Sequence, residues 1–223
     1  MDETPPEPRG HSLAWTAGAC QTWTPAFTSL AALGLSIYNL LLFREPPHVE
    51  VSLPSVLRIG QQSNVVFFIQ PTFTAPNKTE DLEIITKVEL KMQPKDPADS
   101  SVRARFWWNQ LVTFEHPPEN GYKHADDPTP LVISQDKPQK PVFSFVAEDW
   151  KFKAVTYEGS LTFHRRSNKD EPRVERFCLV ISDDDVKEFA KATESSWWWY
   201  PYRNDDPGGR DRHGDCYARW DGY

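Results

Sequence analysis

The longest apolar run in the chain extends from Thr24 to Phe43 and contains no charged residue. Its large apolar side chains would cover every side of a helix, which is typical of a helix surrounded by lipid. The 19 residues from Pro25 onward would measure about 28 Å as a helix, close to the roughly 30 Å hydrocarbon core of a bilayer. Thr24 suits an N-cap and Pro25 suits the first helical position. We therefore predict a transmembrane helix over residues 24–43; the alternative is a buried helix of a soluble domain.

Small and polar residues repeat along one side of this run, at positions Thr28, Ala32, Ser36 and Asn39. Such residues allow two helices in a membrane to approach closely, and an Asn side chain can form a hydrogen bond across the pair. This pattern predicts weak homo-association, or association with another helix. The alternative is that small residues are simply common in membrane spans.

From residue 48 onward the apolar positions follow the two-residue period of β-strands. Ile84–Met92 alternates between apolar and charged residues, whereas Val65–Ile69 is a continuous apolar run that suits a central strand. Strands are predicted at Val49–Leu53, Val65–Ile69, Ile84–Met92, Arg103–Phe114, Pro141–Val146, Val155–Arg165 and Val174–Ile181. About seven strands joined by loops rich in Pro, Asp and Ser favour an antiparallel sandwich or barrel over residues 48–181.

The last predicted hairpin resembles a strand pair of a known class of β-rich modules. Its strands, Thr156–Phe163 and Arg176–Ile181, resemble the closing strand pair of immunoglobulin-like modules. The resemblance implies an all-β fold: an antiparallel immunoglobulin-like β-sandwich, here with one N-terminal transmembrane helix and a short C-terminal helix. It implies no activity, because such sandwiches carry many functions.

Two different segments are predicted after the last strand. Ser182 followed by three Asp residues predicts the start of a helix over residues 182–200, since acidic residues are favourable in a first turn. The Pro and Gly content beyond it predicts a disordered, aromatic and Arg-rich tail over residues 201–223. Five aromatic residues near this boundary are predicted to contact the lipid interface or a partner: Trp197, Trp198, Trp199, Tyr200 and Tyr202. The plainer alternative is that they cover an edge of the sandwich.

Charge and cysteine content bear on location and partners. The acidic, Pro-rich residues 1–23 are predicted to be disordered, and residues 44–47 to form a stiff linker. A net charge of −7 disfavours a nucleic-acid partner. Arg44 after the apolar run favours a cytoplasmic C-terminal domain. The three cysteines are far apart and odd in number, which argues against a disulfide scaffold and for a reducing compartment. We therefore predict a single-pass membrane protein, with the lipid bilayer as one partner and the domain on the cytoplasmic side.

The sequence contains no motif of a hydrolase nucleophile, a zinc protease, a phosphate-binding loop or a dinucleotide site. We accordingly assign no catalytic residue, cofactor or metal, and predict that the chain is not an enzyme. The predicted function is that of a membrane-tethered β-sandwich acting as a protein interaction module. The alternative is a ligand- or metal-binding domain that uses the loop 115–130, where His116 and His124 accompany several carboxylates.

Overall fold

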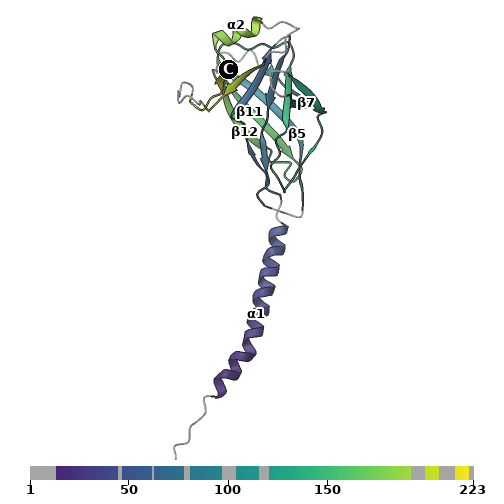
Figure 1. Cartoon of the computed structure of the whole chain (residues 1–223), viewed down its shortest axis with the longest axis vertical. Helices are drawn as coiled ribbons and strands as arrows, with labels where there is room; N and C mark the ends of the chain where they lie inside the picture. The colour runs from purple at the N-terminus through teal and green to yellow at the C-terminus, as the bar shows by residue number, and fades with distance from the viewer. Residues whose placement is uncertain are drawn as a thin grey trace, which may run out of the picture. The chain divides into compact units, whose positions relative to one another are not determined.

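The computed structural model describes the backbone alone over residues 14–24 and all atoms over residues 25–44, 47–61, 63–77, 81–96, 104–115, 121–191, 199–205 and 214–220. The chain divides into two compact units, residues 1–45 and residues 46–223, and each is described by itself. The second unit is mostly β-structure in antiparallel sheets (Figure 1). The predicted all-β antiparallel class is therefore confirmed at this level.

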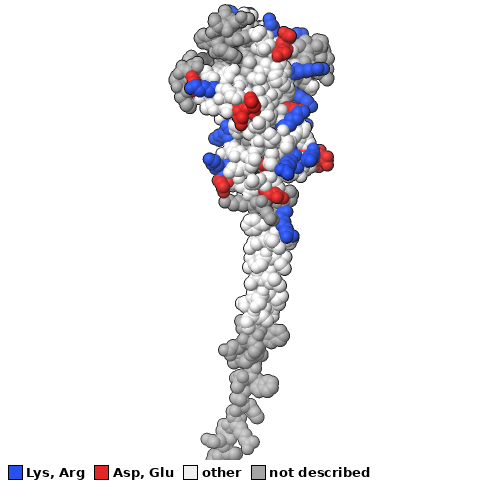
Figure 2. All heavy atoms as spheres, turned by 90° about the vertical axis from the view of Figure 1, so that its right-hand side faces the viewer, with Lys and Arg blue, Asp and Glu red and all other residues white. Residues whose placement is uncertain are grey.

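The described part of the first unit forms the helix α1 (Ala14–Phe43), which is longer than predicted. Pro25 lies inside the helix and does not begin it, so the predicted start at Thr24 is wrong. Ala-rich sequence precedes Pro25, and a helix can continue through a proline at the loss of a backbone hydrogen bond. The segment Pro25–Phe43 is long and apolar enough to cross a membrane. Figure 2 shows its surface free of charge in this view, whereas charges of both signs are interspersed over the second unit.

The larger sheet of the second unit has seven strands in the order β14-β13-β2-β3-β10-β7-β8. All the paired strands within it are antiparallel. The bounds are β2 Val56–Gln61, β3 Val65–Ile69, β7 Trp107–Phe114, β8 Tyr122–Asp126, β10 Val142–Ala147, β13 Trp199–Arg203 and β14 Ala218–Arg219.

The smaller sheet has the order β12-β11-β5-β6, and β9 also pairs with β5. A separate two-stranded ladder joins β1 to β4. The bounds are β1 Glu50–Ser52, β4 Thr72–Thr74, β5 Glu83–Pro94, β6 Ala104–Arg105, β9 Leu131–Ile133, β11 Thr156–Arg165 and β12 Arg173–Val180. Each predicted strand segment thus contains a strand, but β2, β4, β8, β9, β13 and β14 were not predicted.

The two sheets enclose one core, which is built from alternate residues of their strands. Phe67 and Phe143 of the larger sheet and Phe163 of the smaller sheet are fully buried. Phe163 meets Phe143 with ring centroids 6.3 Å apart, and Phe73 with centroids 5.2 Å apart at 85°. Burying one Phe side chain contributes about 1.5–3 kcal/mol, so these aromatic contacts are a principal reason that the sheets stay together.

Gly159 of β11 lies against the ring of Phe177 on β12, and a Cβ atom at Gly159 would overlap that ring. The Phe177 ring is held by Phe67 and Tyr217, with ring centroids 6.0 Å away in each case, so it has little room to move. We expect Gly159→Ala to destabilise the second unit by about 1–3 kcal/mol through overpacking. Thermal unfolding of the full chain measures this loss of stability. Ser160→Ala, at the neighbouring position, is the matched control. Adding Phe177→Leu to the Gly159→Ala variant should restore stability. Equal stability of Gly159→Ala and the wild type would contradict this packing.

Helix α2 (Asp183–Lys191) lies at one end of the sheets (Figure 1) and is shorter than the predicted 182–200. The predicted cap at Ser182 is confirmed. Its backbone N–H and hydroxyl both donate to the Asp185 carboxylate at 2.8 Å, and the Asp185 N–H donates back to Ser182 Oγ. This reciprocal pair satisfies groups that a helix start leaves open. Residues 192–198 of the predicted helix lie outside the described residues.

The C-terminal segment is ordered where it is described, so the prediction of disorder over 201–223 is wrong there. β13 pairs with the edge strand β2, and β14 pairs with β13. Tyr202 and Tyr217 are fully buried in the common core. The Tyr217 main chain bonds to both Cys178 and Val180 of β12. The segment therefore adds β13 and β14 to the β2 side of the larger sheet and contacts β12, the last strand of the smaller sheet, at Leu179.

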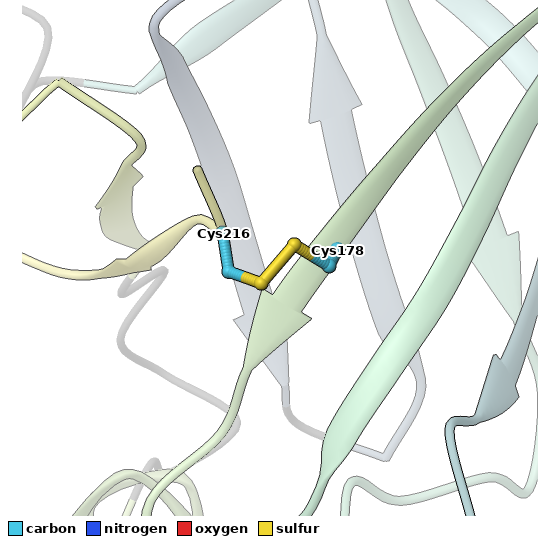
Figure 3. Close-up of a disulfide and its surroundings, with 2 residues drawn as sticks. All are labelled: Cys178 and Cys216. Carbon is cyan, nitrogen blue, oxygen red and sulfur yellow. A yellow bond between two sulfur atoms is a disulfide. The ribbon is translucent and has the colours of Figure 1, made fainter. Parts of the chain in front are cut away.

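Cys178 of β12 and Cys216 form a disulfide (Figure 3), so the expectation against a disulfide is wrong. The two residues are 38 positions apart in the sequence, and nothing in their spacing reveals that β12 and the C-terminal segment are neighbours. Tyr217, next to Cys216, pairs in parallel with Leu179, next to Cys178. The covalent bond and this pairing fix the C-terminal segment to β12 at the same place.

Candidate functional site

The outer face of the larger sheet, turned away from the common core, carries a second apolar cluster. Its buried members are Phe68, Val112 and Val142, one each from β3, β7 and β10. Four partly buried residues pack on them: Val66, Phe114, Tyr122 and Trp199. An outer sheet face is ordinarily polar, so an aromatic cluster at this position marks a candidate binding surface.

The rings of this cluster show that the sheet curls toward its outer face. Trp199 on β13 and Tyr122 on β8 are five strand positions apart, which would be about 24 Å in a flat sheet. Their ring centroids are nevertheless 6.3 Å apart. Phe68, on β3 between these two strands, has its ring centroid 4.9 Å from that of Tyr122 and 5.9 Å from that of Trp199. The curl therefore brings the Tyr122 and Trp199 rings together beside Phe68 on the outer face of the sheet.

Next to this cluster is a groove with a volume of about 410 Å³. Val66, Phe68 and Val146 supply apolar lining from β3 and β10, and Trp107, Tyr122 and Trp199 add aromatic rings. The polar residues come from the β2–β3 connection, from β7 and from the position after β10: Ser63, Asn64, Asn109 and Glu148. Gln61, at the end of β2, also borders the groove, but it is buried and its Oε1 accepts a hydrogen bond from the Phe152 backbone N–H. Trp107 keeps 40% of its surface exposed, an unusual position for a large aromatic residue. The groove therefore combines exposed aromatic faces with several hydrogen-bonding groups.

A β-bulge directs one of the polar side chains. Ser144 of β10 pairs with Gln110, and the next residue, Phe145, pairs with Trp108. Asn109 is thus an extra residue without a counterpart on β10. Bulges of this kind turn a side chain away from the regular alternation and are frequent beside functional sites. Here the bulge lies between Trp107 and the rest of β7, at the groove.

The electrostatics of the groove are simple. Among the described residues that line it, Glu148 is the single charged one, and it is exposed. Burial raises the pKa of Tyr122 above its ordinary value, so the phenol stays protonated and neutral near pH 7. The lining therefore offers uncharged donors and acceptors together with one carboxylate.

The aromatic residues predicted to contact lipid or a partner lie in different environments. Trp199 belongs to the groove, whereas Tyr200 packs on Phe189 of α2 with ring centroids 5.5 Å apart. Tyr202 is fully buried in the core, so its assignment as a contact for a partner or lipid is wrong. Trp197 and Trp198 lie outside the described residues. Because β13 pairs with β2, Trp199–Arg203 covers an edge of the larger sheet, which is what the plainer alternative expected.

The predicted helix-association face remains a prediction. Thr28, Ala32, Ser36 and Asn39 are all exposed along α1. The Ser36 hydroxyl donates to the Ala32 carbonyl oxygen at 2.8 Å, and the Thr28 hydroxyl donates to that of Pro25 at 3.0 Å. Both hydroxyls thus have acceptors within their own helix.

The predicted loop 115–130 contains strand β8, which the sequence analysis missed. His124 lies on β8, with its Nδ1 atom 2.9 Å from Gln110 Oε1 and its Nε2 atom 3.8 Å from Asp127 Oδ1. No group of three or more His, Cys, Asp or Glu residues arranged to hold a metal occurs within the described parts of the chain. His116 and Glu119 fall outside those parts, so the metal-binding alternative is not decided by the geometry.

Two carboxylates in the described part of the chain are buried, and both have structural partners. Glu83 accepts hydrogen bonds from the Ser167 backbone N–H at 3.2 Å and from the Ser167 hydroxyl. Asp185 caps α2 and lies 3.5 Å from Arg219 of β14. Each carboxylate therefore joins segments that are distant in the sequence: β5 to the β11–β12 turn, and α2 to the C-terminal segment.

Most of the groove residues were not predicted, because they come from six separate strands and two connections. The signals that were available are weak: the paired Trp107 and Trp108 within one strand, and an aromatic residue, Tyr122, at the start of a polar segment. Comparison with protein families, with curated proteins and with solved structures finds no match to this chain.

Proposed function

We propose that this chain is a non-catalytic, single-pass membrane protein whose immunoglobulin-like β-sandwich binds a partner through the groove on its larger sheet. The observation that carries the proposal is the concave aromatic lining, which leaves Trp107 partly exposed beside the bulged Asn109. An apolar concavity with a few polar groups is the usual form of a binding site. The interaction role predicted from the sequence is kept, but its location moves from the C-terminal tail to the groove.

Strand order supports the immunoglobulin-like assignment. The order β2-β3-β10-β7 in one sheet and β12-β11-β5 in the other corresponds to the A-B-E-D and G-F-C order of constant-type immunoglobulin domains. Tyr157, near the start of β11, accepts a hydrogen bond at its hydroxyl from the Lys153 backbone N–H at 2.9 Å. This resembles the tyrosine corner that such domains carry on the equivalent strand. Gly159 occupies the place two residues later where antibody domains have a disulfide cysteine.

The disulfide supports an orientation opposite to the one predicted from Arg44 and the cysteine count. Disulfides persist in oxidising compartments and are rare in the cytosol. Because Cys178 and Cys216 are paired, the β-sandwich belongs on the non-cytoplasmic side, with α1 as its membrane anchor. A groove on that side would meet partners outside the cell or in an equivalent compartment.

Photo-crosslinking in intact cells tests the proposal. With p-benzoylphenylalanine in place of Asn109, the full-length chain should form adducts on illumination, because benzophenone inserts into C–H bonds of polypeptides and glycans alike. The same reagent at Val174, which is 37% exposed on the smaller sheet, is the matched control. Trp107→Ala should remove the Asn109 adducts. Their absence, or equal adducts at both positions, would contradict the proposed function.

A further inference from the structure

The Trp199 ring at the groove packs against three neighbouring aromatic rings. The Trp199 ring meets Phe68 at 76° and Phe114 at 75°, both edge to face, and it lies at 31° to Tyr122. An aromatic face carries partial negative charge and therefore attracts C–H groups with partial positive charge. A surface fixed before the ligand arrives also loses little side-chain entropy on binding. The ligand that this surface suits presents flat, C–H-bearing faces.

The polar side chains suit a ligand rich in hydroxyl groups. Asn64 and Asn109 each offer an amide donor and acceptor, and Ser63 offers both through its hydroxyl. A pair of neighbouring hydroxyls on a ligand can donate and accept in the same way. Hydroxyls on an edge and C–H groups on a face occur together on a sugar ring.

The charges and the position of the groove narrow the ligand further. No Lys or Arg is among its described lining residues, and Glu148 would repel an anion, so phosphate, sulfate and uronate groups are disfavoured. The groove residues on β2, β3 and β10 belong to strands that bond to a neighbour on both sides, so an extended peptide could not add to these strands as a further strand. Recognition over these strands must therefore use side chains, and Ser63 and Asn109 are exposed among those at the groove.

We propose that the groove binds a neutral oligosaccharide, stacked on Trp107 and Trp199 and held by Asn64 and Asn109. This inference rests on the proposed function and names the chemical class of the partner. The groove volume of about 410 Å³ is within the range of about 300–1,000 Å³ that small-ligand sites occupy. Its solvent-exposed polar residues would let a longer glycan continue beyond it.

The test uses the full-length chain in phosphatidylcholine nanodiscs. Neutral probes are oligosaccharides of β-1,3-glucan, β-1,4-glucan, α-mannan and β-1,4-galactan; the acidic probes are heparin and polygalacturonate. We expect saturable binding of at least one neutral probe, seen as a change in Trp fluorescence, and no saturable binding of the acidic ones. Trp107→Ala should weaken binding at least about tenfold, and Asn109→Ala several-fold. Glu148→Gln should change the affinity for the neutral probe by less than about threefold. Val174→Ala should leave this affinity unchanged.

Three results would overturn this inference: no binding of any neutral probe, saturable binding of the acidic probes alone, or equal affinity of the wild type and a folded Trp107→Ala variant. Should Trp107→Ala lose the near-UV circular dichroism of the wild type, Asn109→Ala decides in its place. A polypeptide adduct at position 109 that depends on Trp107, without neutral-probe binding, would overturn the glycan inference and leave the proposed function standing. If neither adducts at position 109 nor binding of a neutral probe were observed, both the glycan inference and the proposed function would be contradicted.

Discussion

Tyr217→Ala is expected to destabilise the β-rich unit by about 3–5 kcal/mol, the usual cost of removing a large buried aromatic side chain. Tyr217 is fully buried, and its ring meets Phe177 edge to face at 6.0 Å. Its hydroxyl donates to the Pro54 carbonyl oxygen, and burial raises the pKa of this phenol so that the donor proton is retained. The residue thus joins the C-terminal segment to β12 and to the connection between β1 and β2. Thermal unfolding of the full chain should show a midpoint lower by about 10 °C or more.

Two further variants separate the contributions of Tyr217. Tyr217→Phe keeps the ring but leaves the Pro54 carbonyl without this donor, and should cost about 1–2 kcal/mol. Trp220→Ala removes an aromatic residue of the same segment that is only partly buried, beneath the Arg203 guanidinium at 4.9 Å, and should cost about 0.5–1 kcal/mol. If all three variants unfolded at the wild-type temperature, the C-terminal segment would not be part of the core.

The strands that were predicted from the sequence are those in which the pattern of apolar and polar residues matches the burial of each position. Val65–Ile69 is apolar throughout because residues on one side face the common core and those on the other face the aromatic cluster. Ile84–Met92 alternates because one side of β5 is buried in the core. β8 was missed because it is a polar edge strand with Tyr122 as its single partly buried residue, and polarity is what protects such an edge.

The C-terminal segment was mispredicted for a different reason. Pro201 and the glycines around residue 208 are typical of irregular chain, and local propensity gave no ground for a strand. Three distant interactions outweigh that propensity: pairing of Pro201 with Arg58 on β2, burial of Tyr202, and the bond from Cys216 to Cys178. None of them has a local sequence signature. Proline is tolerated at the edge of a sheet, and Pro201 lies beyond Tyr202 and Arg203, the two residues of β13 that pair with β14.

The groove could not be predicted for a related reason. Its walls depend on the curl that brings Trp199 and Tyr122 together from five strand positions apart, and on the bulge at Asn109. Periodicity indicates which residues share a face of a strand, but not how strongly a sheet bends. Trp199 was predicted as a contact residue, and among the predicted contact residues that the structure describes, Trp199 alone lines the groove.

Loss of the Cys178–Cys216 disulfide is the second large effect that we expect. Closing a loop of 38 residues restricts the unfolded chain, and the chain-entropy estimate for that length is about 4 kcal/mol. The Cys178→Ser/Cys216→Ser double variant should therefore unfold at about 8–16 °C below the wild type. Reduction of the wild type should have the same effect and should add nothing to the double variant. Cys20→Ser, outside the β-rich unit, is the control and should leave the midpoint unchanged.

The same bond also tests the orientation of the chain. A thiol-specific alkylating reagent, applied to chains taken from cells and denatured without reductant, should modify Cys178 and Cys216 only after reduction, because an oxidising compartment keeps them paired. Peptide mass analysis identifies which sulfurs carry the label. Full labelling of both cysteines before reduction would place the β-rich unit in a reducing compartment, as the flanking Arg44 alone suggests. The disulfide would then be absent in the cell, and Tyr217 with the β13–β2 pairing would hold the C-terminal segment without it.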